Sequence, residues 1–120
     1  MQVNTLIKAK TRLADQVGRN SARINGLVNP GGKATSVYFE WGTGTSYGNT
    51  TQALNIGSGS TEVPVSAVIS GLTPGTTYHF RVVTQDGSNG YDYSFTTYRF
   101  GVHLPLIFKA AWSQLKSWVS

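Results

Sequence analysis

Cysteine is absent from this chain of 120 residues, which excludes structural disulfides, cysteine-based zinc sites and thiol nucleophiles together. Only two histidines, His79 and His103, and five scattered carboxylates are present, so the sequence indicates no metal site and no cofactor. No paired carboxylates and no activated nucleophile can be found in the sequence. We therefore expect a protein that is not an enzyme.

Charged residues are also few, and acidic ones are fewer than basic ones: ten Lys and Arg face five Asp and Glu, for a net charge of +5. Half of the basic residues lie within the first 23 positions, without a DNA-binding or RNA-binding motif, so we expect no nucleic-acid partner. A solvated basic strand edge is the favoured interpretation, because such charges discourage pairing with other chains. Lys8, Lys10 and Arg12 interrupt the apolar core that a secretory signal would need, so we expect none.

The most informative stretch that is present runs from Gly71 to Phe80. Pro74 pre-sets the backbone for the second position of a tight turn, and Gly75 can take a positive φ at the next. From Tyr78 onward, apolar residues alternate with more polar ones, as in a strand with one buried face. A tyrosine after such a turn is typical of the tyrosine corner of sandwich domains, so we expect its hydroxyl to bond upstream backbone. The alternative is an ordinary loop before a strand with a core tyrosine.

Strands recur about every ten residues, which predicts a sandwich or barrel. We expect residues 1–10 to form an N-terminal arm and the first strand to run from Arg12 to Val17, anchored by Leu13 and Val17. Pro64 marks its own strand as an edge strand or as a strand start. The other predicted strands contain Ala22, Ile24 and Val28; Val37, Phe39 and Trp41; Val63, Val65, Ala67 and Ile69; Tyr78, Phe80 and Val82; and Tyr91, Tyr93 and Phe95. A loop and a short strand are expected over 43–51.

The ordered features from Leu13 to Thr97 resemble the fibronectin type III family, in the forms common in bacterial and archaeal surface proteins and in phage particles. The motifs that carry the resemblance are Ser21–Pro30, Tyr38–Gly42, Ser46–Gly48, Gly71–Tyr78 and Ser94–Thr97. The resemblance implies an all-β, Ig-like sandwich of seven antiparallel strands over residues 11–97. It also implies that Leu72 and Tyr78 brace the turn between the fifth and sixth strands. Many animal members have a core tryptophan where Gly26 stands, and Trp41 is a candidate to fill the lost volume.

An apolar C-terminal extension, residues 98–120, does not belong to the sandwich. Apolar residues beyond Pro105 recur at helical spacing, which predicts a short amphipathic helix over about 106–119. We expect this segment to pack on identical subunits, because a completed sandwich leaves no groove for it. Folding back onto its own sandwich and docking on a membrane surface are the alternatives. The predicted assembly interface comprises Phe100, Val102, Leu104, Leu106, Ile107, Phe108, Trp112, Leu115, Trp118 and Val119.

These features predict a non-enzymatic structural protein that assembles with copies of itself into a surface layer, filament or virus-like particle, at the cell surface or in a virion. The alternative is an adhesive module that binds a glycan or a host protein through loops at the end of the sandwich. The candidate loop residues are Gly31, Gly32, Lys33, Asp86, Ser88 and Asn89. His79 and Arg81 could contact an anionic glycan, although a solvated strand face is the favoured interpretation.

Overall fold

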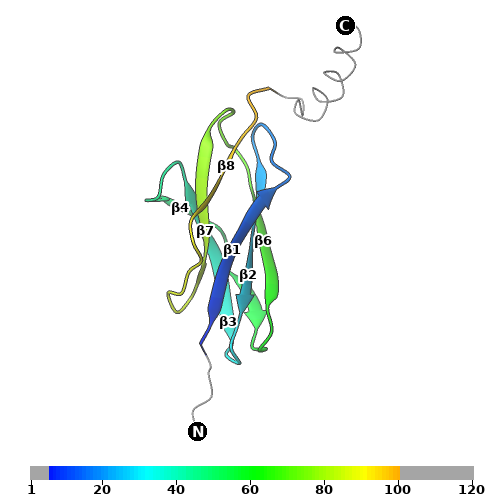
Figure 1. The fold of residues 1–120 in the computed structure, drawn as a ribbon, viewed down its shortest axis with the longest axis vertical. Coiled ribbons are helices and arrows are strands. Elements are labelled where there is room, and N and C mark those ends of the chain that lie inside the picture. Colours follow the sequence, from blue (N-terminus) through cyan, green and yellow to red (C-terminus); the bar gives the residue numbers. More distant parts are fainter. Residues whose placement is uncertain (1–5, 101–120) are drawn as a thin grey trace, which may run out of the picture.

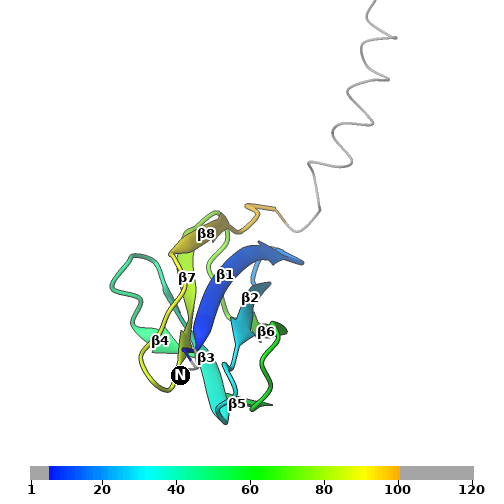
Figure 2. The same ribbon diagram turned by 60° about the horizontal axis from the view of Figure 1, so that its bottom comes forward.

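The computed structural model describes residues 6–100 of the chain. They form two antiparallel sheets that pack face to face, which confirms the predicted all-β sandwich (Figures 1 and 2). One sheet has the order β1-β2-β6, and the other has the order β4-β3-β7-β8, with β5 also paired to β3. The strands are β1 (Lys8–Asp15), β2 (Ala22–Asn29), β3 (Thr35–Gly42), β4 (Asn49–Thr50), β5 (Leu54–Gly57), β6 (Val63–Ile69), β7 (Thr77–Thr84) and β8 (Tyr93–Thr96). Among these residues, no helix long and apolar enough to cross a membrane occurs.

The core lies between the two sheets and follows the alternation predicted for the central strands. The side chains of Ile24 and Val28 on β2 and of Phe39 on β3 are fully buried. Phe80 on β7 packs its ring against Phe39 at a centroid distance of 6.4 Å. Each fully buried aliphatic or aromatic side chain contributes about 1.5–3 kcal/mol before ordering costs. This apolar layer fixes the register of both sheets, because a one-residue slip would turn these side chains outward.

The expected hydrogen bond of the tyrosine corner is present. The hydroxyl of Tyr78 accepts a hydrogen bond from the backbone N–H of Thr73 at 2.8 Å. Gly75 has a φ of +64°, which is the conformation expected of the glycine in this turn. Leu72 is buried beside Tyr78 in the same core. The hydrogen bond of Tyr78 and the buried side chain of Leu72 thus both help to hold the turn between β6 and β7.

The first strand differs from the prediction at both of its ends. β1 begins at Lys8, so the expected arm of residues 1–10 overlaps the sheet, and Ile7 is already buried in the core. Leu13, predicted as an apolar anchor, is 74% exposed, whereas Thr11 is 4% exposed. The pairing of β1 with β2 shifts between Arg12 and Asp15, and this irregularity changes which residues face inward.

The described residues form eight strands instead of the expected seven, because the segment after β3 is divided into β4 and β5. Between them, the backbone N–H of Thr51 donates to the carbonyl of Phe39 at 2.9 Å. The Thr51 hydroxyl accepts from the Phe39 N–H at 2.9 Å. A side-chain oxygen thus takes the place of a ladder carbonyl and interrupts the regular pairing.

Gly26 marks a close contact between the sheets and not a gap that Trp41 fills. A Cβ at Gly26 would lie 3.1 Å from the Cβ of Val82 and 3.1 Å from the carbonyl oxygen of Lys10. Trp41 packs elsewhere, with its ring 6.0 Å from that of Tyr78. Val82 therefore occupies the volume that Trp41 was expected to supply.

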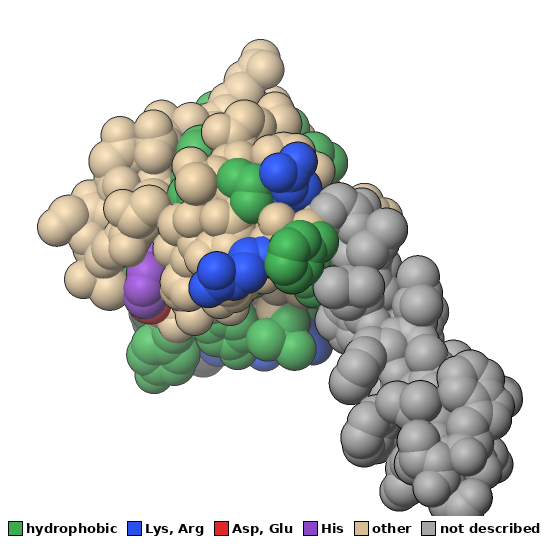
Figure 3. All heavy atoms as spheres, turned by 90° about the horizontal axis from the view of Figure 1, so that it is seen from above, with side chains coloured by type: hydrophobic (Ala, Val, Ile, Leu, Met, Phe, Trp, Pro, Cys, Tyr) green, Lys and Arg blue, Asp and Glu red, His purple; other side chains and the backbone are tan. Residues whose placement is uncertain are grey.

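The chain leaves the sandwich through residues 97–100, after β8. The N–H of Tyr98 donates to the carbonyl of Gly18, and the buried Thr97 hydroxyl donates to the carbonyl of Thr73 at 2.6 Å. Phe100 is 60% exposed. Figure 3, which looks down on this end, shows Lys and Arg side chains beside hydrophobic ones. The predicted helix and the assembly residues from Val102 to Val119 lie outside the described residues.

Candidate functional site

A contact between β1 and the segment that precedes β8 forms the base of a groove. Gly90 lies so close to β1 that a Cβ there would overlap the backbone nitrogen and the hydroxyl of Thr11 and come within 3.0 Å of the Lys10 carbonyl carbon. The Gly90 N–H donates to the carbonyl of Val82 at 3.0 Å, which holds this segment against β7. The Thr11 hydroxyl in turn accepts from the N–H of Val82 at 3.4 Å. Gly90 is needed here for close approach of two backbones, because any side chain would push β1 away.

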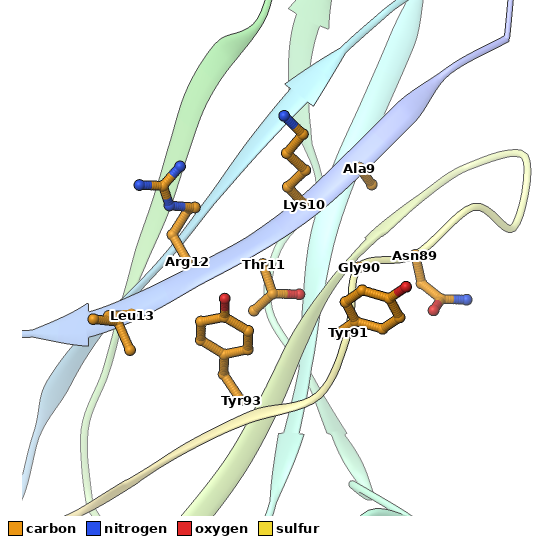
Figure 4. Close-up of a pocket in the computed structure, with 9 residues that line it drawn as sticks. All are labelled: Ala9, Lys10, Thr11, Arg12, Leu13, Asn89, Gly90, Tyr91 and Tyr93. Atoms are coloured by element: carbon orange, nitrogen blue, oxygen red, sulfur yellow. The ribbon is translucent and has the colours of Figure 1, made fainter.

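The groove itself lies beside this contact, between β1 and residues 89–93, and has a volume of about 660 Å³ (Figure 4). Figure 4 shows the rings of Tyr91 and Tyr93 on the side formed by residues 89–93, whereas Lys10 and Arg12 project from β1 on the side away from these rings. Tyr91 is 88% exposed, the largest value among the exposed large hydrophobic side chains of the described residues. The lining residues are Ala9, Lys10, Thr11, Arg12, Leu13, Asn89, Gly90, Tyr91 and Tyr93.

The electrostatics of the groove are positive. Lys10 forms an exposed ion pair with Glu62 at 2.8 Å. The hydrogen bond from Lys10 lowers the pKa of Glu62, and the charge of Arg12 adds a smaller effect in the same direction. Arg12 forms no ion pair within the part of the chain that the structure describes. The lining residues of the groove thus include two tyrosines, one asparagine and two basic residues, and no carboxylate.

A second, shallower hollow of about 490 Å³ lies on the outer face of the β1-β2-β6 sheet and shares Arg12 and Leu13 with the groove. Several of the polar side chains that line this hollow already form hydrogen bonds within the protein. Arg23 donates two hydrogen bonds to the carboxylate of Asp15, at 2.8 and 2.6 Å, and these lower the pKa of Asp15 to about 2. Asn25 donates to the same carboxylate at 3.1 Å. This hollow therefore offers fewer free groups than the groove.

The outer face of the other sheet carries a polar network that includes the two residues suggested as contacts for an anionic glycan. Arg81 donates to Glu40 at 2.8 Å, and its guanidinium lies 5.0 Å from the ring centroid of Tyr47. The Tyr47 hydroxyl donates to Asp92 at 2.9 Å, and His79 shares a hydrogen bond with the other oxygen of Asp92 at 2.8 Å. Burial, followed by the hydrogen bond to Asp92, raises the pKa of Tyr47 to about 12. His79 and Arg81 are thus already engaged by carboxylates.

The two loops predicted as alternative ligand loops lie at the same end of the sandwich. The Gln85 side chain donates to the carbonyl of Ala34 at 3.0 Å, which ties the second loop to the first. Asp86 is occupied within its own turn, where it accepts hydrogen bonds from the Thr84 hydroxyl and from the Ser88 N–H. These bonds lower its pKa. Of the predicted loop residues, the structure places Asn89 in the groove, and Gly31, Gly32, Lys33, Asp86 and Ser88 outside it.

No group of three or more His, Asp and Glu side chains that could hold a metal ion occurs within residues 6–100. Each of the five carboxylates of the chain accepts a hydrogen bond or forms an ion pair in this structure. A carboxylate serving as a general base or nucleophile would need to face a substrate instead. None of these carboxylates is among the lining residues of the groove.

Sequence reasoning did not find the groove, since its two sides are separated by about eighty residues. It placed Tyr91 in the last strand, but β8 begins at Tyr93, and the ring of Tyr91 is free to face solvent. The signal that could have found the groove is Gly90. In the structure the turn closes at Ser88, whose carbonyl accepts from the Thr84 N–H at 2.8 Å, so Gly90 lies outside the turn to which the sequence pattern assigned it.

No protein-family model and no curated protein matches the chain. The solved structures that share its fold include three of sensor domains of the anti-sigma factor RsgI4 of Pseudobacteroides cellulosolvens. A longer form has a TM-score of 0.64 at 22% identity and covers 81% of this chain and 94% of that one. A shorter form has a TM-score of 0.66 at 22% identity, covering 82% and 100%. The solution structure has a TM-score of 0.63 at 20% identity, covering 78% and 76%.

These comparisons overturn the functional prediction. The interpretation as a self-assembling structural subunit of a layer, filament or virion is wrong, because the three structures compared here are sensor domains of an anti-sigma factor. The physical reasoning behind it depended on the apolar stripe of residues 106–119, which lies outside the described residues. The likeness therefore shows the sandwich fold alone. The class of ligand has to be inferred from the groove itself.

Proposed function

We propose that this chain is a recognition domain of the regulatory sensing type, which binds a ligand in the groove between β1 and residues 89–93. The observation that carries the proposal is the groove itself, which is lined by the rings of Tyr91 and Tyr93 and by the Asn89 amide beside β1. Ligand sites combine an apolar lining with a few placed polar groups, and this groove has both. The likeness to sensor domains of an anti-sigma factor supports a sensing role.

The proposal includes a non-enzymatic role and a location outside the cytoplasm. The non-enzymatic role is supported by the five carboxylates, because each already accepts a hydrogen bond or forms an ion pair and none is left to act as a base or a nucleophile. The likeness to sensor domains supports the location, because a domain that senses a ligand in the surroundings of the cell has to face them. A cell-surface location is therefore the part of the earlier expectation that we retain.

The family assignment is likewise a proposal: we place residues 11–97 in the fibronectin type III family. Two observations support it. The strand orders β1-β2-β6 and β4-β3-β7-β8, with β5 also paired to β3, give two packed antiparallel sheets, and two packed sheets are what the resemblance implies. The hydrogen bond between Tyr78 and Thr73 lies at the turn where the family's corner is expected.

The experiment that tests the function is a ligand screen by NMR on the isotope-labelled full chain. The panel contains neutral and acidic oligosaccharides, short peptides and small aromatic acids. We expect one class to move the amide signals of residues 9–13 and 89–93, and Tyr91→Ala to abolish that movement. Leu54→Ala, at an exposed apolar residue outside the groove, should leave it intact. A panel in which no class moves the groove signals, or one in which signals move only elsewhere, would refute the proposal.

A further inference from the structure

We infer that the ligand of this groove is a neutral oligosaccharide, which lays the C–H face of a sugar ring on Tyr91 and directs its hydroxyls to Tyr93 and Asn89. This inference rests on the proposed function and names the class of ligand. Its three premises are the two rings on one side of residues 89–93, the lack of charge on that side, and the blocked backbone edge of β1.

The rings of Tyr91 and Tyr93 share one side of their segment because Asp92, which lies between them, is held on the other. The Asp92 carboxylate accepts from the Tyr47 hydroxyl at 2.9 Å and shares a hydrogen bond with His79 at 2.8 Å, on the outer face of the sheet. Neighbouring side chains of an extended segment point to opposite sides, so both rings turn towards β1, as Figure 4 shows. Two aromatic rings thus line one wall of the groove.

This wall combines an exposed ring with free hydroxyls, which suits a sugar. Tyr91 is 88% exposed, and a ligand that covered it would remove a large apolar area from water. A sugar ring presents C–H groups on one face, which can cover the phenol, and hydroxyls on its rim. The hydroxyls of Tyr91 and Tyr93 form no hydrogen bond within the part of the chain that the structure describes, unlike those of Tyr47 and Tyr78. Together with the Asn89 amide, they offer donors and acceptors to the rim of a sugar.

The ring side of the groove carries no charged side chain among its lining residues. The positive charge of the groove comes from Lys10 and Arg12, and both project from β1 on the side away from the rings (Figure 4). No Asp or Glu lines the groove. A charged ligand in contact with the rings would lose hydration there without meeting an opposite charge, which is unfavourable. A neutral ligand therefore fits this side of the groove better than an acidic or a basic one.

An uncharged peptide would also be neutral, but the backbone geometry disfavours it. An extended peptide binds to a sheet by adding a strand to a free edge. The free edge of β1 is covered at its middle, because the backbone of Gly90 lies directly against Thr11 and a Cβ there would overlap the Thr11 nitrogen. The same segment is bonded to β7, where the N–H of Gly90 donates to the carbonyl of Val82. Recognition in this groove therefore has to proceed through side chains, which suits a carbohydrate.

The test is an NMR titration of the labelled full chain at about 0.15 M salt, where long-range attraction is screened. The neutral probes are cellotetraose, xylotetraose, mannotetraose and laminaritetraose. The comparison probes are tetragalacturonate, which is an acidic sugar of the same length, and tetraalanine with both ends capped, which is an uncharged peptide. We expect at least one neutral tetrasaccharide to move the signals of residues 9–13 and 89–93. Tetragalacturonate should bind no more tightly than that sugar, and the peptide should leave the groove signals in place.

Variants locate the effect. Tyr91→Ala should weaken binding of that tetrasaccharide at least about tenfold, because the apolar contact is lost. Tyr91→Phe keeps the ring and should weaken binding less than Tyr91→Ala does, while Asn89→Ala should weaken it about three- to tenfold through a lost hydrogen bond. Arg12→Gln should weaken it far less than Tyr91→Ala, and the control Leu54→Ala, outside the groove, should leave it unchanged. Equal losses for Arg12→Gln and Tyr91→Ala would place the ligand on the basic side of β1 and overturn the inference.

The outcomes also separate this inference from the proposed function. Tighter binding of tetragalacturonate than of every neutral sugar at the groove would overturn the neutral ligand and leave the groove as a recognition site. Movement of the groove signals by the capped peptide or by the small aromatic acids, and by no neutral sugar, would overturn the carbohydrate in the same way. If none of these probes and no member of the wider panel moves the groove signals, both proposals fail.

Discussion

Substituting Gly90 by alanine tests the idea that close approach of two backbones builds the groove. The new Cβ would overlap the nitrogen and the hydroxyl of Thr11, and its distance to the Lys10 carbonyl carbon would be 3.0 Å. These contacts are mainly with backbone, so β1 or residues 89–91 must move. Overpacking of this kind costs about 1–3 kcal/mol. Losing the hydrogen bond from the Val82 N–H to the Thr11 hydroxyl adds about 1 kcal/mol.

We therefore expect Gly90→Ala to lower the free energy of unfolding by about 2–4 kcal/mol. For a domain of this size the melting temperature should fall by about 10–20 °C. Urea unfolding followed by tryptophan fluorescence measures the first quantity, and calorimetry the second. The control is Gly59→Ala, where a Cβ would meet nothing within 4 Å and the stability should change by less than about 0.5 kcal/mol. Equal stabilities of the two variants would refute the reasoning.

Three further predictions concern side chains at the turn, the sheet surface and the loop after β3. Tyr78→Phe leaves the Thr73 N–H without its partner and should lower the free energy of unfolding by about 1–2 kcal/mol in urea titrations, so an unchanged midpoint would contradict the corner. Asp15 has a folded pKa of about 2, below its unfolded value, so its contribution to stability is present above about pH 4 and is lost as the pH falls towards 2. Asp15→Asn should flatten that acid slope in melting curves recorded across this range, and an identical slope would count against the ion pair with Arg23. The Tyr47 pKa of about 12 predicts one phenol that ionises last in an alkaline absorbance titration, with stability lost between about pH 10 and 12. Tyr47→Phe should remove that last transition while the others stay, and its persistence would assign it to another tyrosine.

The strands that sequence patterns predicted well are those whose two faces differ in polarity. Ile24 and Val28 on β2 and Phe39 on β3 alternate with more exposed neighbours, and all three are fully buried. The turn before β7 was predictable because Pro74 and Gly75 have defined backbone preferences, and the structure has the expected positive φ at the glycine.

The first strand was mispredicted because hydrophobicity alone does not decide which residues face inward. Leu13 was chosen as an anchor for its apolar side chain, yet it lies on the solvent side, and the polar Thr11 is buried. Thr11 can be buried because its hydroxyl accepts a hydrogen bond from Val82 on a distant strand. No pattern within β1 reveals that partner.

The candidate site was hidden for a related reason. Arg12 and Tyr91 come from opposite ends of the sandwich sequence, and the contact that joins their segments depends on the glycine between Asn89 and Tyr91. A local pattern indicates that residues 86–90 form a turn. It does not indicate which strand that turn will touch, because strand order is set by long-range packing.

Residues 6 and 100 leave the described body at opposite ends of its long axis (Figure 1). Tension applied between them would therefore run lengthwise through β1 and β8. The hydrogen bonds of an antiparallel pair lie across the strands, so such a pull would load many of them at once instead of opening them one by one. The bond from Thr97 to the Thr73 carbonyl would take part of that load at the exit. Joined to a larger structure at both ends, this domain would behave as a stiff link that transmits force along its length.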